Sequence, residues 1–504
     1  MAVPDPSPAP QVRTTAGAVR GRGEGGLAVF RGIPFARPPV GALRFQAPRP
    51  AEPWTGTRDA SGFGPPPPQP QGPVVSAPPG AGDPENWLTV NVWSPDLGAA
   101  GLPVMVWIYG GAYVAGASSG RAYDGAALAR RGVVVVSFNY RVGMEGFAQF
   151  TGAPANRGLL DQVAALRWVQ DNIAAFGGDP GRVTVFGESA GAGSVASLLA
   201  MEDAAGLFRR AIAQSVPGTF FAAELAADLA AAAAREVGRP PAAAALSEVD
   251  PDRLVAAGQA VLASFGRNAD RWGAVAHTLT PFSPVVDGEV LTATPWQALS
   301  GGRARDVELI TGHNRDECRL FTAGPQLASA ELASAEMPAA VAAFSPQPGG
   351  AGAYRAAYPE ADAGRLYELA YSDWLFRMPT LRLAEAHATA GGRTYLYELA
   401  YPAPGAPLGA CHGLDVPLVF GTLHADFGRM LFGDPVPGAA VRLGEQMRAD
   451  WTAFAAGQLT GWPAYEPTRR LTRVYDDPST EQAYPEETSR RLWAGHQFGP
   501  LPLF

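Results

Sequence analysis

Short apolar runs alternate with longer segments of helical periodicity through much of the chain. Apolar runs bounded by turn residues are typical of buried strands, and strands alternating with helices predict a parallel sheet with crossover helices. Residues 159–176 carry apolar side chains at helical spacing between two such runs. The pattern predicts an α/β fold with a doubly wound sheet. The expected buried strands are 104–109, 133–138, 183–186, 210–214 and 307–311.

Three segments interrupt this alternation. Residues 62–84 are rich in proline and glycine, which predicts a loop. Residues 222–258 and 325–390 contain alanine-rich helical stretches, and we expect them to form cap insertions over the strand ends rather than separate domains. A helix at 439–456 and a late strand at 471–475 complete the pattern, so we expect one domain over residues 1–504.

Composition and charge exclude several function classes. The chain contains no lysine, so all 39 basic residues are arginines, which excludes a P-loop phosphate site, a pyridoxal Schiff base and a Ser–Lys hydrolase. The formal net charge of −8 argues against nucleic acid or an anionic membrane as partner. No apolar run approaches the roughly 20 residues of a spanning helix. The first residues lack the features of a secretory signal, so we expect a cytoplasmic protein.

The motif Gly187-Glu188-Ser189-Ala190-Gly191 carries the clearest chemical signal. It follows the predicted strand 183–186 and opens a helical stretch of small residues, 190–200. A strand that turns directly into a helix exposes the hydroxyl of the middle serine at a helix N-terminus, where negative charge is stabilised. The motif also occurs by chance in glycine-rich chains, but its context favours a nucleophile at Ser189.

An acyl-transfer serine needs hydrogen-bond donors for the oxyanion. The N–H of Ala190, next to the nucleophile, is one candidate. The predicted strand 104–109 is followed by a loop of small residues in which the N–H groups of Gly111 and Ala112 are the others. The alternative for this loop is a plain tight turn.

Five sequence blocks, which follow one another along the chain, resemble the type B carboxylesterases of the α/β-hydrolase family. The resemblance spans roughly residues 11 to 475. It implies an α/β-hydrolase fold, with a large, mostly parallel central sheet flanked by helices and with helical cap insertions, and ester hydrolysis without a metal or organic cofactor. The blocks are 30–45, 88–95, 139–147, 158–180 and 183–194.

The resemblance also implies the partners of the nucleophile. The acid of the family matches Glu317 within residues 311–321, and its histidine matches His412 within 411–421. The order serine, acid, histidine is that of the fold. Asp316 is the alternative acid, and His313, read as a loop residue, is the alternative histidine.

Further positions carry weaker expectations from the resemblance. Glu188 and Ser215 are expected beside the triad, although an exposed hydroxyl at a strand end is an equal interpretation of Ser215. Arg44 and Glu85 match an ion pair that ties down the loop before the second block, the alternative being two solvated charges. Many members of the family have cysteines that bridge this region, and these cysteines are missing here. We therefore expect the 62–84 loop either to be held by proline stiffness and packing alone or to be mobile.

The two cysteines, Cys318 and Cys411, stand directly beside Glu317 and His412 in the sequence. Two thiols cannot build a four-thiolate zinc site, and at most one bridge is possible. Because Glu317 and His412 are expected to touch, a bridge between their neighbours is one hypothesis. Two separate buried thiols are the favoured one.

These observations predict a serine carboxylesterase for aryl or bulky-alcohol esters, acting through an acyl-enzyme. Its partner would be a small-molecule ester, and the chain would be a monomer or weak homo-oligomer. A histidine base predicts loss of activity as the pH falls through about 6.5. The alternatives are a catalytically idle, cholinesterase-like binding module and a carbamate or amide hydrolase with the same triad. Aromatic residues expected around the substrate are Tyr113, Phe147, Phe220, Phe221 and Phe321.

Overall fold

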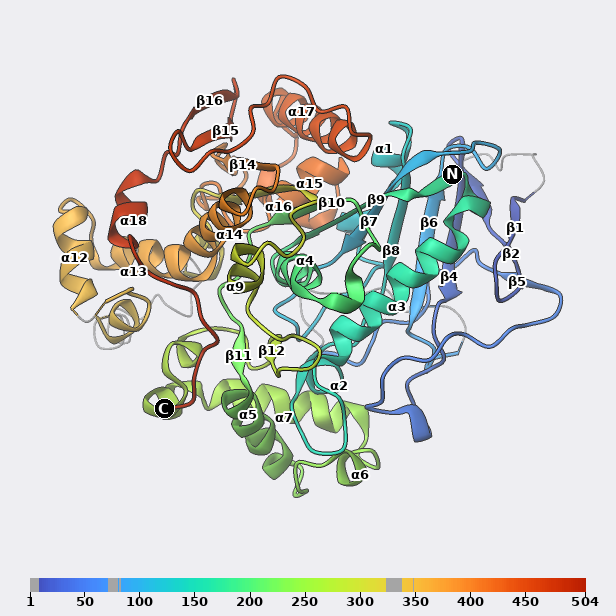
Figure 1. Ribbon diagram of the computed structural model, residues 1–504, viewed down its shortest axis with the longest axis horizontal. Helices are drawn as coiled ribbons and strands as arrows, with labels where there is room; N and C mark the ends of the chain where they lie inside the picture. The colour runs from blue at the N-terminus through green and yellow to red at the C-terminus, as the bar shows by residue number, and fades with distance from the viewer. Residues whose placement is uncertain (1–8, 71–79, 81–82, 323–337, 348) are drawn as a thin grey trace.

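The computed structural model describes residues 9–70, 80, 83–322, 338–347 and 349–504. Within these residues a sheet of 11 strands crosses the molecule in the order β16-β15-β14-β13-β10-β9-β7-β8-β6-β4-β3 (Figure 1). Its strands are β3 (Arg22–Glu24), β4 (Leu27–Pro34), β6 (Thr89–Ser94), β7 (Leu102–Ile108), β8 (Val134–Phe138), β9 (Gly178–Glu188), β10 (Arg210–Gln214), β13 (Glu308–Asn314), β14 (Thr394–Leu399), β15 (Leu471–Tyr475) and β16 (Thr480–Ala483).

The centre of this sheet is parallel. Every pairing from β8 through β7, β9, β10, β13 and β14 to β15 is parallel. The strands β7 and β8 are almost entirely buried, as expected for parallel strands covered on both faces. The predicted parallel sheet and its buried strands are therefore confirmed. The sequence pattern did not predict the antiparallel edge of β6, β4 and β3.

Two groups of helices cover the sheet (Figure 1). One group comprises α3 (Arg157–Asn172), α4 (Ala190–Ala200), α9 (Pro295–Ser300) and α14 (Met378–Thr389), and the other comprises α1 (Ala126–Ala129), α15 (Asp415–Phe420) and α17 (Gly438–Ala455). The predicted helix 159–176 is α3 followed by a 3-10 turn at Ile173–Phe176. Within the described ranges, none of the helices combines the length and apolarity needed to cross a membrane.

The two predicted insertions are helical where the structure describes them. The first contains α5 (Ala223–Glu236), α6 (Ala243–Leu246) and α7 (Pro251–Ala263), drawn in green at the bottom of Figure 1. The second contains α12 (Gly350–Ala357), α13 (Ala363–Ser372) and α14. Its residues 325–337 and 348 lie outside the described part of the chain. Because α14 packs against β13 and β14, this part of the insertion lies on the sheet. The single domain stays a prediction.

The loop predicted at 62–84 has polar anchors. Its described residues form neither helix nor strand, and residues 71–79 and 81–82 lie outside the description. The Gln69 amide donates to the carbonyl of Gly116 at 2.9 Å and accepts from the Gly116 N–H at 2.8 Å. The Asn139 amide donates to the carbonyl of Pro65 at 3.0 Å. Hydrogen bonds therefore hold the start of the loop, in addition to the proline stiffness and packing inferred from the sequence.

The predicted ion pair between Arg44 and Glu85 is wrong. The Nε and Nη2 atoms of Arg44 donate instead to Glu145 Oε1, at 2.9 and 2.6 Å. The side chains of Arg44 and Glu145 are only 9% and 6% exposed. A buried guanidinium needs a buried partner, since an uncompensated charge away from water is costly. Glu145, on the short helix Gly143–Phe147, provides this partner, while Glu85 is exposed.

Candidate active site

The candidate residues meet at one edge of the sheet. Ser189, Ser215 and Glu317 follow β9, β10 and β13, and His412 lies in the loop between β14 and α15. These four strands are neighbours and run parallel. The carboxyl ends of parallel strands share an edge, so positions more than 200 residues apart in sequence come together there.

Ser189 lies at a sharp turn between β9 and α4. Its φ of 58° and ψ of −126° are strained for a residue with a side chain. A Cβ on Gly191 would lie 2.0 Å from the carbonyl oxygen of Ile108, and one on Gly187 would lie 2.7 Å from the same oxygen. The two glycines therefore allow strand and helix to approach this closely. Ser189 is half-buried, whereas its neighbours in the chain are buried.

Glu317 holds the imidazole of His412. Its Oε2 lies 2.6 Å from His412 Nδ1, while its Oε1 accepts from the hydroxyl of Ser215 at 2.5 Å and from the N–H of Asn314 at 2.8 Å. Glu317 and Ser215 are fully buried. The carboxylate is thus fixed by three donors and orients the imidazole so that Nδ1 donates and Nε2 is free to accept. The interpretation of Ser215 as an exposed hydroxyl is wrong.

The free nitrogen of His412 faces Glu188. Nε2 lies 3.0 Å from Glu188 Oε1, on the residue before Ser189. In the described part of the chain no hydrogen bond joins Nε2 to Ser189 Oγ, and Glu188 Oε1 has no hydrogen-bond partner. Catalytic hydrogen bonds are often loose before substrate binds and tighten in the complex. The arrangement therefore brings Glu188, His412 and Ser189 into one cluster.

The charges around His412 change its protonation. Burial by itself would lower the pKa of His412, but the carboxylates of Glu188, Glu317 and Asp415 outweigh burial and raise this pKa above its ordinary value. Burial raises the pKa of Glu188, because an ionised carboxylate loses its water there. Glu188 and His412 therefore compete for a proton, and His412 binds one at pH values where an isolated histidine is neutral.

Replacing Glu188 by glutamine should change the pH dependence of the reaction. A histidine base acts only when neutral, so a raised pKa places the acid limb of kcat/KM above the ordinary value of about 6.5. Glu188→Gln removes one negative charge that raises the pKa, and the acid limb should move to lower pH. Profiles of kcat/KM against pH for wild type and variant measure this shift.

The matched control is Glu202→Gln, which removes an exposed carboxylate after α4 and should leave the profile in place. An unmoved acid limb in Glu188→Gln, or a limb moved to higher pH, would show that Glu188 does not raise the pKa of the base.

The loop after β7 reaches the nucleophile. A Cβ on Gly110 would lie 3.0 Å from Ser189 Cβ. The next two residues have positive φ angles, 124° at Gly111 and 53° at Ala112, and both are half-buried. Among the described residues, the N–H groups of Gly111, Ala112 and Ala190 have no hydrogen-bond acceptor. Three free donors close to one hydroxyl are suited to binding an oxyanion.

Two phenyl rings flank the imidazole. Phe321 lies 5.3 Å from the His412 ring, and Phe376, which the sequence reasoning missed, stacks on it at 4.2 Å with an interplanar angle of 21°. Of the five aromatics predicted around the substrate, only Phe321 has a ring contact with His412 within the described residues. The other four are buried and pack as core residues: Tyr113 on Phe147, Phe220 on Trp296, and Phe221 in β11 (Phe221–Ala222), which pairs with β12 (Val285–Val286).

The alternative triad residues have other partners. Asp316 pairs with Arg319 and Arg365, at 2.7 and 3.2 Å. His313 is buried in β13 rather than in a loop, and its Nε2 lies 3.0 Å from the hydroxyl of Tyr484. Burial and the nearby Arg377 lower the pKa of His313 to about 4.

Both cysteines are buried free thiols, so the structure has the favoured arrangement and not the bridge. No group of three His, Cys, Asp or Glu side chains in the described ranges is placed to hold a metal ion.

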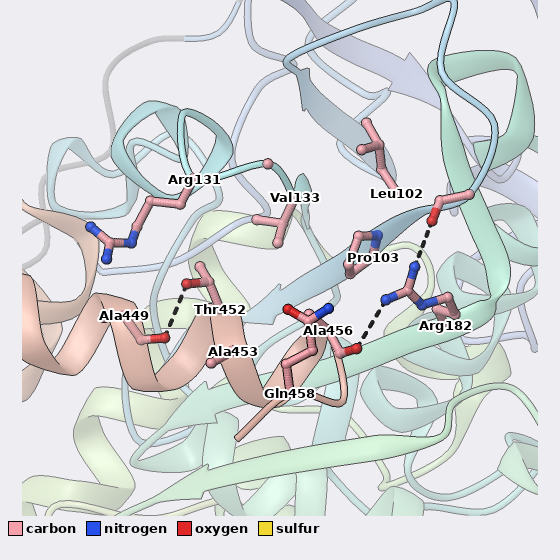
Figure 2. A pocket seen from close by; sticks show the side chains of 12 residues that line it. Leu102, Pro103, Arg131, Val133, Arg182, Ala449, Thr452, Ala453, Ala456 and Gln458 are labelled. Carbon is pink, nitrogen blue, oxygen red and sulfur yellow. Dashed lines mark hydrogen bonds between the residues drawn. The ribbon is translucent and has the colours of Figure 1, made fainter. Parts of the chain in front are cut away.

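A cavity of about 580 Å³ lies elsewhere in the fold (Figure 2). Its lining includes the first residues of β7, the residues before β8 and the last turn of α17. The guanidinium of Arg182 donates to the carbonyls of Gly101 and Ala456, at 2.8 and 2.9 Å. This is the amino end of the parallel strands, whereas Ser189 lies at the carboxyl end. The cavity is therefore separate from the candidate site.

Fold and site together define an α/β hydrolase, and comparison with known proteins identifies the family. The model of the carboxylesterase family matches residues 8–487. The para-nitrobenzyl esterase of Bacillus subtilis is 35% identical over 95% of this chain and 97% of its own length, and the phenmedipham hydrolase of Pseudarthrobacter oxydans is 35% identical over 94% and 96%. The crystal structure of a carboxylesterase from Geobacillus stearothermophilus superposes with a TM-score of 0.83 at 34% identity, covering 96% of this chain and 99% of that one.

The chain belongs to the carboxylesterase family and is a carboxylic ester hydrolase.

Proposed function

We propose that the protein is a serine carboxylesterase in which Ser189, His412 and Glu317 form the catalytic triad. The observation that carries the proposal is the contact of 2.6 Å between His412 Nδ1 and a fully buried Glu317, beside a strained, half-buried serine. The geometry supports all three roles. The chain has a serine, a histidine and a carboxylate at the proposed positions, which disfavours the idle binding module.

In the first half-reaction the Ser189 hydroxyl attacks the ester carbonyl. His412 Nε2 takes the hydroxyl proton and returns it to the leaving alcohol, while Glu317 stays ionised and stabilises the imidazolium. The N–H groups of Gly111, Ala112 and Ala190 receive the developing oxyanion. Each such donor typically stabilises the transition state by about 3 kcal/mol. The product of this half is an acyl-enzyme on Ser189.

In the second half-reaction water replaces the alcohol. His412 takes a proton from the water, which attacks the acyl carbonyl, and the same N–H groups bind the second oxyanion. His412 then returns the proton to Ser189 as the acid leaves. The triad provides the nucleophile and the proton transfers, so the proposed mechanism uses no cofactor.

The proposed substrates are esters of aryl or bulky alcohols. Phe321 and Phe376 make the side of the site at His412 apolar and aromatic. The Gly-Gly-Ala loop resembles the variant associated with roomy alcohol pockets, and the relative named para-nitrobenzyl esterase supports esters that carry an aromatic ring. A monomeric or weakly oligomeric state and a cytoplasmic location stay predictions.

A panel of esters tests the proposal. We expect hydrolysis of para-nitrophenyl esters of increasing acyl length and of one tertiary-alcohol ester, with aryl esters cleaved faster than the ethyl esters of the same acids. The matching anilides and carbamates test the alternative specificity. Failure to cleave any ester, or faster cleavage of the anilides, would overturn the proposed function.

A further inference from the structure

A π-helical turn, Asp373–Arg377, joins α13 to α14 and lies against the triad. Such turns are rare and occur frequently at functional sites. Pro379, two residues further on, leaves one carbonyl of this turn without its helical donor. Proline has no N–H, so the carbonyl of Leu375, its helical partner, needs another donor. The N–H of Gly218 provides this donor at 2.7 Å.

Three hydrogen bonds join this π turn and its flanking residue to the loops that carry the site. Leu375 accepts from Gly218, three residues after Ser215. The hydroxyl of Ser372 accepts from the N–H of Cys318 at 3.0 Å, next to Glu317. Arg377 Nη1 donates to the carbonyl of Arg315 at 3.1 Å, two residues before Glu317. The π turn is therefore fixed relative to the candidate acid.

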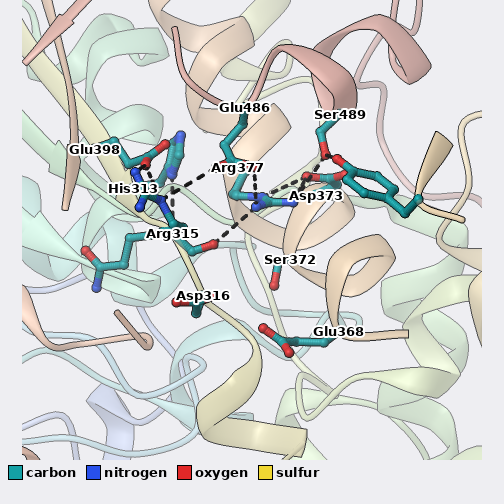
Figure 3. A network of polar contacts seen from close by, with 12 residues as sticks. His313, Arg315, Asp316, Glu368, Ser372, Asp373, Arg377, Glu398, Glu486 and Ser489 are labelled. Carbon is teal, nitrogen blue, oxygen red and sulfur yellow. Dashed lines mark hydrogen bonds and ion pairs between the residues drawn. The ribbon is translucent and has the colours of Figure 1, made fainter. Parts of the chain in front are cut away.

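A buried ion pair holds the π turn in shape (Figure 3). Arg377 Nη2 lies 2.6 Å from Asp373 Oδ1, with the two side chains 1% and 0% exposed. The same guanidinium contacts Glu486 at 3.0 Å and donates to Ser489 at 3.2 Å. The second Asp373 oxygen accepts from the hydroxyl of Tyr354 at 2.8 Å. Arg377 thus links the π turn, the acid loop and the C-terminal segment.

The residue that this turn presents to the site is Phe376. Its ring is 3% exposed and lies nearly parallel to the imidazole of His412. Glu317 contacts Nδ1 of the imidazole and Glu188 lies close to Nε2, but these two contacts leave the ring free to rotate about the line that joins the two nitrogens. A stacked ring removes this freedom, because it fixes the plane of the imidazole and therefore the direction of the Nε2 lone pair.

We propose that Phe376 is a positioning residue that sets the plane of the His412 imidazole, and that the Asp373–Arg377 pair holds Phe376 in place. This inference rests on the proposed function, since it assigns to Phe376 the orientation of the proposed base. A small misorientation of a reacting group is enough to lower a rate by about 100-fold.

Replacement of the ring tests the first part. Phe376→Leu should lower kcat for a para-nitrophenyl ester by about 10- to 100-fold and change KM by less than about threefold, because orientation is lost and not substrate binding. Phe376→Tyr retains a ring and should restore most of kcat. Phe30→Leu is the matched control: Phe30 in β4 is fully buried and packs edge-on against Phe176, and within the described residues it has no ring contact with His412 or the π turn, so kcat should be unchanged.

The NMR signals of the His412 ring provide a second measurement, because they would not change if Phe376 only filled space in the core. In the wild type, the ring current of Phe376 should shift the carbon-bound protons of His412 upfield, and their signals are assigned by their absence in His412→Asn. Phe376→Leu should remove this shift, and Phe30→Leu should retain it. If Phe376→Leu does not fold, Phe376→Met, which fills the space with a flexible side chain, should give the same two results.

The role of the Asp373–Arg377 pair is tested in the wild-type protein and in the Phe376→Leu variant. Arg377→Lys retains the charge but loses the planar fork that reaches several partners at once, so it should lower kcat in the wild type. If Arg377 acts through Phe376, the same change should have no further effect on kcat in Phe376→Leu. Effects that multiply in the double variant would overturn the anchoring role.

Two outcomes would overturn the positioning role: wild-type kcat in a Phe376→Leu protein that has lost the ring-current shift, or a shift unchanged by the substitution. Failure of the proposed function looks different, because Ser189→Ala would then retain activity.

Discussion

Ser189→Ala is expected to lower kcat for ester hydrolysis by about 10⁴-fold or more while leaving the fold intact. The alanine has no oxygen to attack the ester, so the acyl-enzyme cannot form. The methyl group occupies the position of the serine Cβ, and the backbone hydrogen bond from residue 189 to the carbonyl of Gln214, 2.9 Å long, remains. Steady-state kinetics on a para-nitrophenyl ester and a thermal unfolding curve measure the two parts of this expectation.

Ser197→Ala is the matched control for the nucleophile. Ser197 lies on the same helix, α4, and its buried hydroxyl donates only to the carbonyl of Gly193 at 2.8 Å in the described structure. The substitution should slightly lower the stability of the fold and leave kcat unchanged. A similar loss of activity in both variants would mean that the helix, and not the Ser189 hydroxyl, determines the rate.

His412→Asn is expected to reduce kcat by about 10⁴-fold as well, because the variant has no base to take the serine proton. Triad residues act as a unit, so the double variant with Ser189→Ala should be no less active than either single variant. Single-turnover rates of the two single variants and the double variant show whether the effects of the two substitutions fail to add.

His424→Asn is the control for the histidine. His424 is exposed, outside the cluster of Glu317, Glu188 and Phe376, and its loss should leave the rate unchanged. A single His412→Asn variant that retains more than about a tenth of wild-type kcat would remove His412 from the role of base.

The strands at the centre of the fold could be predicted, and residues for a site could be proposed, because both have local signals. The buried strands are short runs of β-branched residues, and the turn at Ser189 is specified by two glycines whose Cβ positions would collide with the backbone of Ile108 or Gly191. Ser189 is proposed from its motif between strand and helix, whereas Glu317 and His412 are proposed from the resemblance of their loops to the family. The structure then places all three at the carboxyl ends of neighbouring strands.

The features that were missed depend on contacts between distant segments. The resemblance predicts Glu85 as the partner of Arg44, but the actual partner, Glu145, stands in an otherwise apolar stretch, and nothing nearby in sequence marks the pair. In the sequence, nothing distinguishes Phe376 from an ordinary aromatic residue of the core. Only Pro379, which interrupts a helical pattern shortly after it, signals an irregular turn. The position of Glu188 against His412 Nε2 also needed the tertiary structure, since the motif alone does not set the direction of this side chain.

Covalent labelling tests the central claim, that Ser189 is the nucleophile, most directly. The wild-type protein is treated with an organophosphate, its intact mass is measured, and the modified peptide is sequenced. We predict one adduct per chain, on Ser189, with loss of esterase activity in proportion to labelling, and no adduct on Ser189→Ala. An adduct on another residue that accompanies the loss of activity, or full esterase activity in protein labelled at Ser189, would contradict the account.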